Sequence, residues 1–431
     1  MEQPSDKEVV TPVKVVALRH FKRLMPLLQR LHEVGCERDT AGNRSLFMDG
    51  YCALVMLYLF NPLIDSIAML QAVARVPRVA KVLGLKPFSA GSFSESVRVF
   101  DPEQMKSIIA ELAGELKPLS KDPRLSELKH ALTLVDSTVL QGLSRLAGAA
   151  CEQTRYCTTK DGRALHGWRL HMQLDLELFN THKAKVTGAC KRGPNSETAV
   201  LRQSLESNRC YVGDGGYDDR QLFDAIVQAG SSYVIRIREN SVFTVVEERL
   251  LSQEALDANL VRDALVCLGD ADAAEMNHPV RLIEVQVDPH PQRTRRVQEG
   301  SNKSTRYTDR LLIVTNLIDL PPELVALIYC YRYSVELFFR FFKQLLGMRH
   351  LLSQREEGVE IQVYCCVIAC MLISLETGKK PGKVMARMIG LYLMGVAEEQ
   401  DLVDFLNRPD NKGKKIRERE ERFKKLGLLP R

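Results

Sequence analysis

The sequence predicts a mixed α/β fold, in which a core of strands and helices is interrupted by a β-rich insertion and flanked by helical regions at both ends. Three observations predict this arrangement. Apolar residues recur every three or four positions over 15–117 and again over 360–405, as in packed helices. Short apolar runs alternate with helical segments between residues 130 and 240, as expected where helices cover a sheet. A basic, strand-containing segment then precedes an aromatic run that looks helical, 327–347.

The changes of pattern along the chain define five segments. We expect a helical N-terminal domain that binds DNA ends, a first part of the core, the β-rich insertion, a second part of the core and a basic helical C-terminal region. Their ranges are 1–125, 126–239, 240–320, 321–375 and 376–431. The short N-terminal helices with tight turns suit helix-turn-helix DNA binding, and they suit any helical bundle equally well.

The core elements follow one another in the order strand, strand, strand, helix, strand, helix, strand. Strands are expected where apolar and β-branched residues form short runs, and helices where apolar residues recur at three- and four-residue spacing. The expected strands are 131–140, 168–177, 181–189, 210–214 and 232–240, and the expected helices are 195–206 and 220–230. The insertion should contain two more strands, 281–288 and 310–317.

Positive charge is concentrated in two segments of a chain whose net charge is +6. The segment 290–310 has six Lys or Arg and two acidic residues, and the segment 408–431 has ten and four. Concentrated positive charge favours a polyanionic partner, because binding releases counterions. A solvated loop and a solvated tail would have the same composition, so both interpretations stay open.

Other features point to a cytoplasmic protein without a membrane partner. The uncharged run 361–375 is shorter than the roughly 20 residues of a transmembrane helix. The acidic, polar N-terminus is no signal peptide. The eleven cysteines form no CxxC pair and are typical of core residues in a reducing compartment. The glycines at 213–216 are not followed by the GK[ST] of a phosphate-binding loop, so we expect no nucleotide cofactor.

The aromatic run 327–347, LIYCYRYSVELFFRFFKQLLG, combines apolar packing with a set of polar residues. If it forms one continuous helix, Arg332, Glu336 and Lys343 lie within roughly 60° of Tyr329, so that all four share one stripe. Such a stripe either faces water or lines a site that holds both anions and cations.

Three carboxylates have unusual positions. Asp136 lies in the middle of an apolar strand, Asp214 ends a strand before a Gly-Gly turn, and Glu336 lies on the polar stripe. A lone acid in an apolar strand is unfavourable unless it is paired or binds a cation. Oxygen ligands favour Mg²⁺ or Mn²⁺, and two such ions about 4 Å apart promote phosphodiester transfer. Arg332 and Lys343 would then hold phosphates beside the metal ions.

These residues also carry a resemblance to a known family. Tyr329, Arg332, Glu336 and Lys343 have the spacing Y-x2-R-x3-E-x6-K, which resembles the YREK signature of DDE transposases of bacterial insertion sequences, in the IS-four group. VDST at 135–138 resembles that family's first-aspartate strand, and DGGY at 214–217 resembles its second motif. The resemblance spans about residues 130–350. It implies an RNase H-like core with a β-rich insertion before the glutamate helix, in agreement with the strand order expected from the residues.

The resemblance implies an activity and a set of residue roles. Asp136, Asp214 and Glu336 would be the catalytic metal ligands, with two Mg²⁺ or Mn²⁺ ions per active site. Tyr329, Arg332 and Lys343 would contact DNA phosphates near the transposon end. The reaction would be cut-and-paste DNA transposition, a form of DNA recombination, by a nucleoid-associated protein that forms a homodimer in the synaptic complex. The DNA partners would be the terminal inverted repeats and the target.

One departure from the family concerns base flipping. Some relatives stack a flipped base on a Trp in the insertion, whereas the one Trp here, Trp168, precedes the insertion. Phe243 or Tyr307 would have to serve instead. Either could equally be a core residue.

Two alternatives to a transposase stay open. The first is another RNase H-like metal-dependent nuclease, such as a resolvase or an RNA–DNA hybrid hydrolase; the YREK spacing and the long insertion argue against it. The second is a non-catalytic DNA-binding relic, against which the intact acid triad argues. Strand transfer distinguishes the transposase from the other nucleases, and metal-dependent cleavage distinguishes both from the relic.

Overall fold

The structure is a computed structural model that describes residues 19–407 with gaps at 43, 62, 120–121, 142–166, 189–192, 270–275, 288–309, 346–350, 354 and 394–395. The basic tail 408–431, nearly all of the basic segment 290–310 and Tyr307 therefore lie outside the described residues. The chain divides into two compact units. We call residues 118–340 the sheet unit, and residues up to 117 together with 341–409 the helical unit; each is described by itself.

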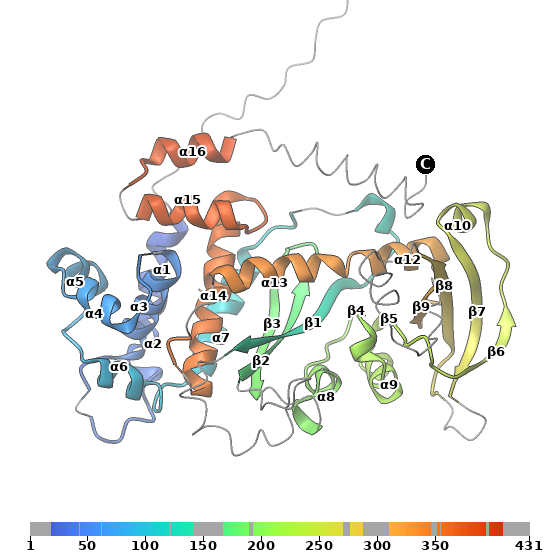
Figure 1. The fold of residues 1–431 in the computed structure, drawn as a ribbon, viewed down its shortest axis with the longest axis horizontal. Coiled ribbons are helices and arrows are strands. Elements are labelled where there is room, and N and C mark those ends of the chain that lie inside the picture. The colour runs from blue at the N-terminus through green and yellow to red at the C-terminus, as the bar shows by residue number, and fades with distance from the viewer. Residues whose placement is uncertain are drawn as a thin grey trace, which may run out of the picture. The chain divides into compact units, whose positions relative to one another are not determined.

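The sheet unit contains one nine-stranded sheet with the order β3-β2-β1-β4-β5-β9-β8-β7-β6 (Figure 1). The strands are β1 (Ala131–Gln141), β2 (Gly167–Asp175), β3 (Asn180–Gly188), β4 (Arg209–Gly213), β5 (Ser232–Arg236), β6 (Phe243–Glu248), β7 (Leu260–Leu268), β8 (Val280–Gln286) and β9 (Arg310–Thr315). Its helices are α8 (Glu197–Arg202), α9 (Arg220–Gln228), α10 (Gln253–Asp257), α12 (Pro322–Cys330) and α13 (Tyr333–Leu345), the last of which continues into the helical unit.

Strand directions confirm the expected mixed α/β fold. β1, β2 and β3 are antiparallel neighbours, whereas β4 and β5 run parallel to β1. This is the order and direction of the RNase H-like core that the sequence predicts. The insertion does not form a separate sheet: β9 pairs with β5, Val234 opposite Thr315, and β8, β7 and β6 extend the same sheet. The sequence analysis missed β6 and β7.

The two faces of the central strands have different partners. One face, with Val135, Tyr211 and Tyr233, packs with α9 in a buried apolar cluster. Residues that alternate with these point to the other face, because side chains alternate along a strand. Helix α12 packs over β4, β5, β7, β8 and β9 (Figure 1). It covers that other face, since its residue Leu324 lines a cavity together with Ile313 of β9.

The expected single helix over 327–347 is wrong, because the chain breaks between α12 and α13. The amides of Tyr331 and Arg332 bond to carbonyls three residues back, at 3.1 and 3.0 Å, instead of four. At this break, the Tyr331 hydroxyl donates a hydrogen bond to Asp122. Tyr329 therefore lies in the last turn of α12, Arg332 lies in the turn between the helices, and Glu336 lies in the first turn of α13.

The helical unit packs its helices around α14 (Glu356–Thr377). The others are α1 (Arg19–Gln29), α2 (Leu31–Val34), α3 (Met48–Phe60), α4 (Ile67–Ala74), α5 (Pro77–Leu83), α6 (Ala90–Ser96), α7 (Met105–Glu115), α15 (Lys383–Leu393) and α16 (Glu399–Asn407). Arg23 of α1 donates two hydrogen bonds of 2.7 Å to Glu115 at the end of α7. The N-terminal helices thus share one core with α14, and their expected role in binding DNA ends stays a prediction.

Helix α14 is longer than the uncharged run at 361–375 that the sequence analysis weighed. Among the described helices, it is the one long and apolar enough to cross a membrane by length and composition. However, 89% of its most apolar stretch is buried inside the structure. Such burial is typical of the central helix of a packed core.

Candidate active site

The first two candidate carboxylates are brought together by the pairing of β1 with β4. The two strands run parallel, with Ala131 opposite Arg209 and Leu134 opposite Val212. The same register, continued by two residues, places Asp214 beside Asp136, and neighbouring strands lie about 4.8 Å apart. The two-residue step also puts both aspartates on the face of the sheet that holds Leu134 and Val212.

A third charged residue, Arg236, continues the same row. β4 and β5 are parallel with Gly213 opposite Ile235, so the next pair in register is Asp214 and Arg236. Arg236 is in turn paired with Ile313 of β9, on the face that α12 covers. The sequence analysis did not single out Arg236, although a cation at the end of a strand beside an aspartate strand was a usable signal.

The turn after β4 fixes the Asp214 side chain. Asp214 is the N-cap of a short 3₁₀ helix, Gly215–Tyr217, and its Oδ1 accepts a hydrogen bond of 2.9 Å from the Gly216 amide. Such a cap restrains the carboxylate at the strand end. Its second oxygen can still bind a ligand on the α12 side of the sheet.

The Asp136 carboxyl carries the most perturbed charge of the site. Its pKa is raised to about 7, first by burial and then by the negative charges of Asp214 and Glu197. The Ser137 amide donates to Asp136 Oδ1 at 2.7 Å, and this bond and the charge of Arg332 oppose the rise. Negative charge at this position is therefore only partly compensated by the protein.

Arg332 links the third carboxylate to the other two. Its Nη2 donates a hydrogen bond of 2.9 Å to Glu336 Oε1. Burial by itself lowers the pKa of Arg332, but Tyr329, Glu336 and Asp214 together raise it. Its charge also lowers the pKa of Asp136. The guanidinium thus interacts with all three candidate carboxylates: it bonds to Glu336, and its charge acts on Asp136 and Asp214.

Tyr329 belongs to the same group of side chains. The guanidinium carbon of Arg332 lies 6.0 Å from the centre of the Tyr329 ring, the outer limit of a cation–π contact. Burial raises the pKa of the Tyr329 hydroxyl, and the charges of Arg332 and Arg236 oppose that rise. Lys343 lies in the last turn of α13, within the helical unit. Its role in binding DNA stays a prediction.

Asp136 and Asp214 fit a divalent cation. They are oxygen donors, Asp136 lies within β1 and Asp214 directly follows the adjacent strand β4, and the negative charge at Asp136 is only partly offset. No three Asp, Glu, His or Cys side chains of the described residues are grouped closely enough to hold a metal ion. The Glu336 carboxylate pairs with Arg332 through Oε1 and, in the described part of the chain, does not form a close group with the two aspartates. Its role as a ligand stays a prediction.

Two more charged residues, which the sequence analysis missed, lie behind Asp136. Glu197, in the first turn of α8, accepts a hydrogen bond from the Ser137 hydroxyl and another of 2.7 Å from Arg169 Nη1. Arg169 is buried in β2. The sequence signal for this pair was an arginine within an apolar strand, because a buried guanidinium needs an acidic partner nearby.

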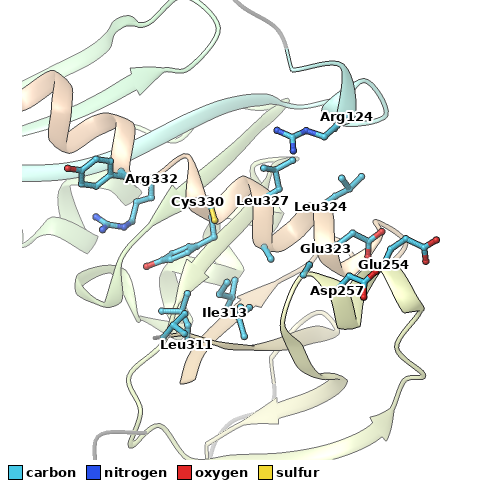
Figure 2. Close-up of a pocket in the computed structure, with 16 residues that line it drawn as sticks. Arg124, Glu254, Asp257, Leu311, Ile313, Glu323, Leu324, Leu327, Cys330 and Arg332 are labelled. Carbon is cyan, nitrogen blue, oxygen red and sulfur yellow. The ribbon is translucent and has the colours of Figure 1, made fainter. Parts of the chain in front are cut away.

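A cavity of about 400 Å³ lies between α12 and the strands of the insertion (Figure 2). Its walls are mainly apolar, with Leu311, Ile313 and Leu327 among them, and it extends to Tyr329 and Arg332.

Two of the aromatic residues considered for base stacking, Trp168 and Phe243, lie on different strands of the sheet unit. Trp168 is half-buried in β2, and Phe243, at the start of β6, packs against the apolar cluster that α9 covers. Phe243 therefore has a packing role in this structure. A stacking role for Phe243 or Tyr307 stays a prediction, and Tyr307 lies outside the described residues.

Comparison with known proteins identifies the family. Residues 127–372, more than half of the chain's 431 residues, match the family described as "Transposase DDE domain". The chain is 25% identical to the putative transposase y4zB of Sinorhizobium fredii over 265 residues, which cover 61% of this chain and 65% of that one. It is 23% identical to the probable transposase for insertion sequence element IS5377 of Geobacillus stearothermophilus over 299 residues, which cover 68% and 69%. The match thus spans about two thirds of each relative.

A more distant similarity links the chain to a solved structure, the piggyBac transposase synaptic complex with hairpin DNA. It covers 99% of this chain and 86% of that one at 11% identity, with a TM-score of 0.37, which is too low to bear on the fold. The family match is much stronger evidence. It spans more than half of the chain and includes Asp136, Asp214 and Glu336, and the chain therefore belongs to the DDE transposase family.

Proposed function

We propose that this protein is a transposase of the IS-four group, which cuts DNA at transposon ends and joins the freed ends to target DNA in a metal-dependent reaction. One observation carries the proposal: parallel pairing of β1 and β4 sets Asp136 beside Asp214, with their charge only partly compensated, inside the region that matches the transposase family. A carboxylate pair whose protonation is perturbed by burial and by a like charge is typical of a functional site.

The proposed chemistry consists of two phosphoryl transfers. In the first, water attacks the phosphorus at the transposon end, the P–O3′ bond breaks, and a 3′-hydroxyl and a 5′-phosphate result. In the second, that 3′-hydroxyl attacks a phosphodiester of the target and the target's own 3′-oxygen leaves. Bound Mg²⁺ or Mn²⁺, two ions per site, would supply Lewis-acid stabilisation of the attacking and leaving oxygens.

The chain's residues would divide the work. Asp136, Asp214 and Glu336 would hold the metal ions as carboxylates, which for Asp136 requires loss of its proton. Arg332, once released from Glu336, would bind a DNA phosphate near the scissile bond. Tyr329 beside it and Lys343, two turns beyond Glu336 along α13, would bind neighbouring phosphates.

The proposed partners follow from the same reaction. They are the terminal inverted repeats of the element, the target DNA and a second copy of the chain in the synaptic complex. The name of the relative from Geobacillus stearothermophilus, which refers to an insertion sequence element, supports this proposal. The protein would act in the cytoplasm, at the nucleoid.

The test is a labelled transposon-end duplex incubated with the full chain, with Mg²⁺ and with a target plasmid. We expect nicking at the end and joined products. Nicking without joining would favour another RNase H-like nuclease, and binding without nicking would favour a non-catalytic relic. Glu336→Gln, which keeps shape but removes charge, should abolish both reactions while DNA binding persists. Nicking by this variant at the wild-type rate would contradict the assignment of Glu336.

A further inference from the structure

Glu197 is held in place by two donors at one of its oxygens. Its Oε1 accepts from the Ser137 hydroxyl and, at 2.7 Å, from Arg169 Nη1. Arg169 Nη1 also donates to Ser137 Oγ at 2.7 Å, which closes a three-membered network. Ser137 directly follows Asp136 on β1, so the network grips the strand at the candidate metal ligand.

The other oxygen of Glu197 lies beside the turn that follows the second aspartate. A Cβ atom built on Gly216 would lie 2.7 Å from Glu197 Oε2 and 3.0 Å from Asp214 Oδ1. Both oxygens are thus within 3.0 Å of one point, so a Cβ at position 216 would displace the Glu197 oxygen from its present position. Glu197 therefore bonds through Oε1 to Ser137, the neighbour of Asp136, and its Oε2 lies beside Gly216 in the turn after Asp214.

Arg169 prevents Glu197 from moving away. The Arg169 side chain is 5% exposed, and among the described residues its Nε has no hydrogen-bond partner. A buried guanidinium that lost Glu197 would be left with an uncompensated charge, which is strongly unfavourable. The ion pair consequently fixes the start of α8 against β1 and β2.

We propose that Glu197 is a positioning residue for the metal site: it joins β1 to the turn after β4 and so sets the separation of the Asp136 and Asp214 carboxylates that a divalent cation requires. This inference rests on the proposed function. Partners behind metal ligands fix ligand orientation, and their loss reduces metal affinity by about 10- to 100-fold.

Two variants of the full chain test the inference without DNA, with Mn²⁺ as the probe and calorimetric titration as the readout. In Glu197→Gln, the amide oxygen can still accept from Ser137 and Arg169, but an NH₂ group replaces the oxygen that lies beside Gly216. In Gly216→Ala, no charge changes, and a Cβ is forced between Glu197 and Asp214. We expect each to weaken Mn²⁺ binding by about 10- to 100-fold, while thermal unfolding without metal shows a folded protein.

The matched control is Glu206→Gln, which makes the same change at a carboxylate of similar exposure, bonded to His182, Lys183 and Arg209. It should bind Mn²⁺ within about twofold of wild type. Wild-type affinity in folded Glu197→Gln and Gly216→Ala would overturn the inference; if Glu197→Gln does not fold, Gly216→Ala decides. If Asp136→Asn leaves Mn²⁺ binding unchanged, the proposed function itself fails, a result distinct from failure at Glu197 alone.

Discussion

Two acidic regions lie at opposite ends of strand β4, and they hold their carboxylates in opposite ways. At the start of the strand, Glu206 is bonded to Lys183 at 2.7 Å, to His182 at 2.6 Å and to Arg209 at 3.0 Å. Burial by itself raises the pKa of Glu206, but the bonds from Lys183 and His182 lower it to about 2. Beyond the end of the strand, burial and neighbouring acids raise the pKa of Asp136 to about 7.

The difference distinguishes a structural ion-pair network from the proposed cation site. Every charge of the Glu206 cluster has a protein partner, so the cluster gains little from an added ion. At Asp136 and Asp214 the protein supplies Arg332 as a shared cation and leaves negative charge uncompensated. Uncompensated carboxylates on neighbouring rigid elements repel one another and weaken the fold, unless a ligand neutralises them.

The largest expected effect is on DNA cleavage. Asp136→Asn and Asp214→Asn should each reduce Mg²⁺-dependent nicking of a transposon-end duplex by more than about 100-fold, since even the loss of a partner behind a ligand reduces metal affinity by about 10- to 100-fold. Both should fold at least as well as wild type in EDTA, because a repulsive charge is removed. If both variants nicked DNA within about tenfold of the wild-type rate, the aspartates would have no more catalytic function than the Glu206 cluster at the other end of β4.

The corresponding change at the other end of β4 is Glu206→Gln, which removes a carboxylate that has protein partners. It should destabilise the protein by about 1–2 kcal/mol, toward the lower part of the range for charged hydrogen bonds because the side chain is partly exposed. Its nicking rate, measured below the melting temperature, should equal that of wild type. A variant with unchanged stability in urea unfolding would mean that the Glu206 network contributes nothing, and the contrast between the regions would weaken.

Arg332→Ala sharpens the comparison from the side of the cation. Loss of one phosphate contact should lower the slope of log affinity against log salt for a transposon-end duplex by about 0.9. Lys343→Ala, on the same helix, should lower the slope equally. Of the two variants, only Arg332→Ala should raise the pKa of Asp136 further, because in the wild type the positive charge of Arg332 lowers that pKa. Equal salt slopes for wild type and both variants, in fluorescence anisotropy, would exclude phosphate contacts.

The smallest expected effect is on stability against pH in EDTA. The raised pKa of Asp136 means that the folded protein binds this proton more tightly than the unfolded chain. The fold is therefore stabilised as pH falls from about 7 toward 4. Glu206, with its lowered pKa, has the opposite effect: its contribution is lost as pH falls from about 4.5 toward 2. Asp136→Asn should flatten the first dependence in thermal unfolding and leave the second; an unchanged slope between pH 4 and 7 would contradict the assignment.

Much of this protein could be predicted from the sequence, because the relevant signals are local. Apolar runs predicted the five core strands in order, and the family match confirms the resemblance to DDE transposases, while the YREK signature stays a prediction. Asp136 could be identified because an acid in an apolar strand is unfavourable unless it is paired or binds a cation. By contrast, β6 was missed because it is short and mostly exposed, so no buried face generates a pattern.

The tertiary structure alone decided what pairs with what. The break between α12 and α13 coincides with a hydrogen bond from Tyr331 to Asp122, 209 residues earlier in the chain, and helical periodicity cannot predict such a contact. The row of Asp136, Asp214 and Arg236 depends on strand register. The approach of Glu197 to both aspartates depends on the packing of α8 beside a glycine turn. Periodicity records which face of an element is buried, whereas register and long-range contacts arise only when the strands assemble.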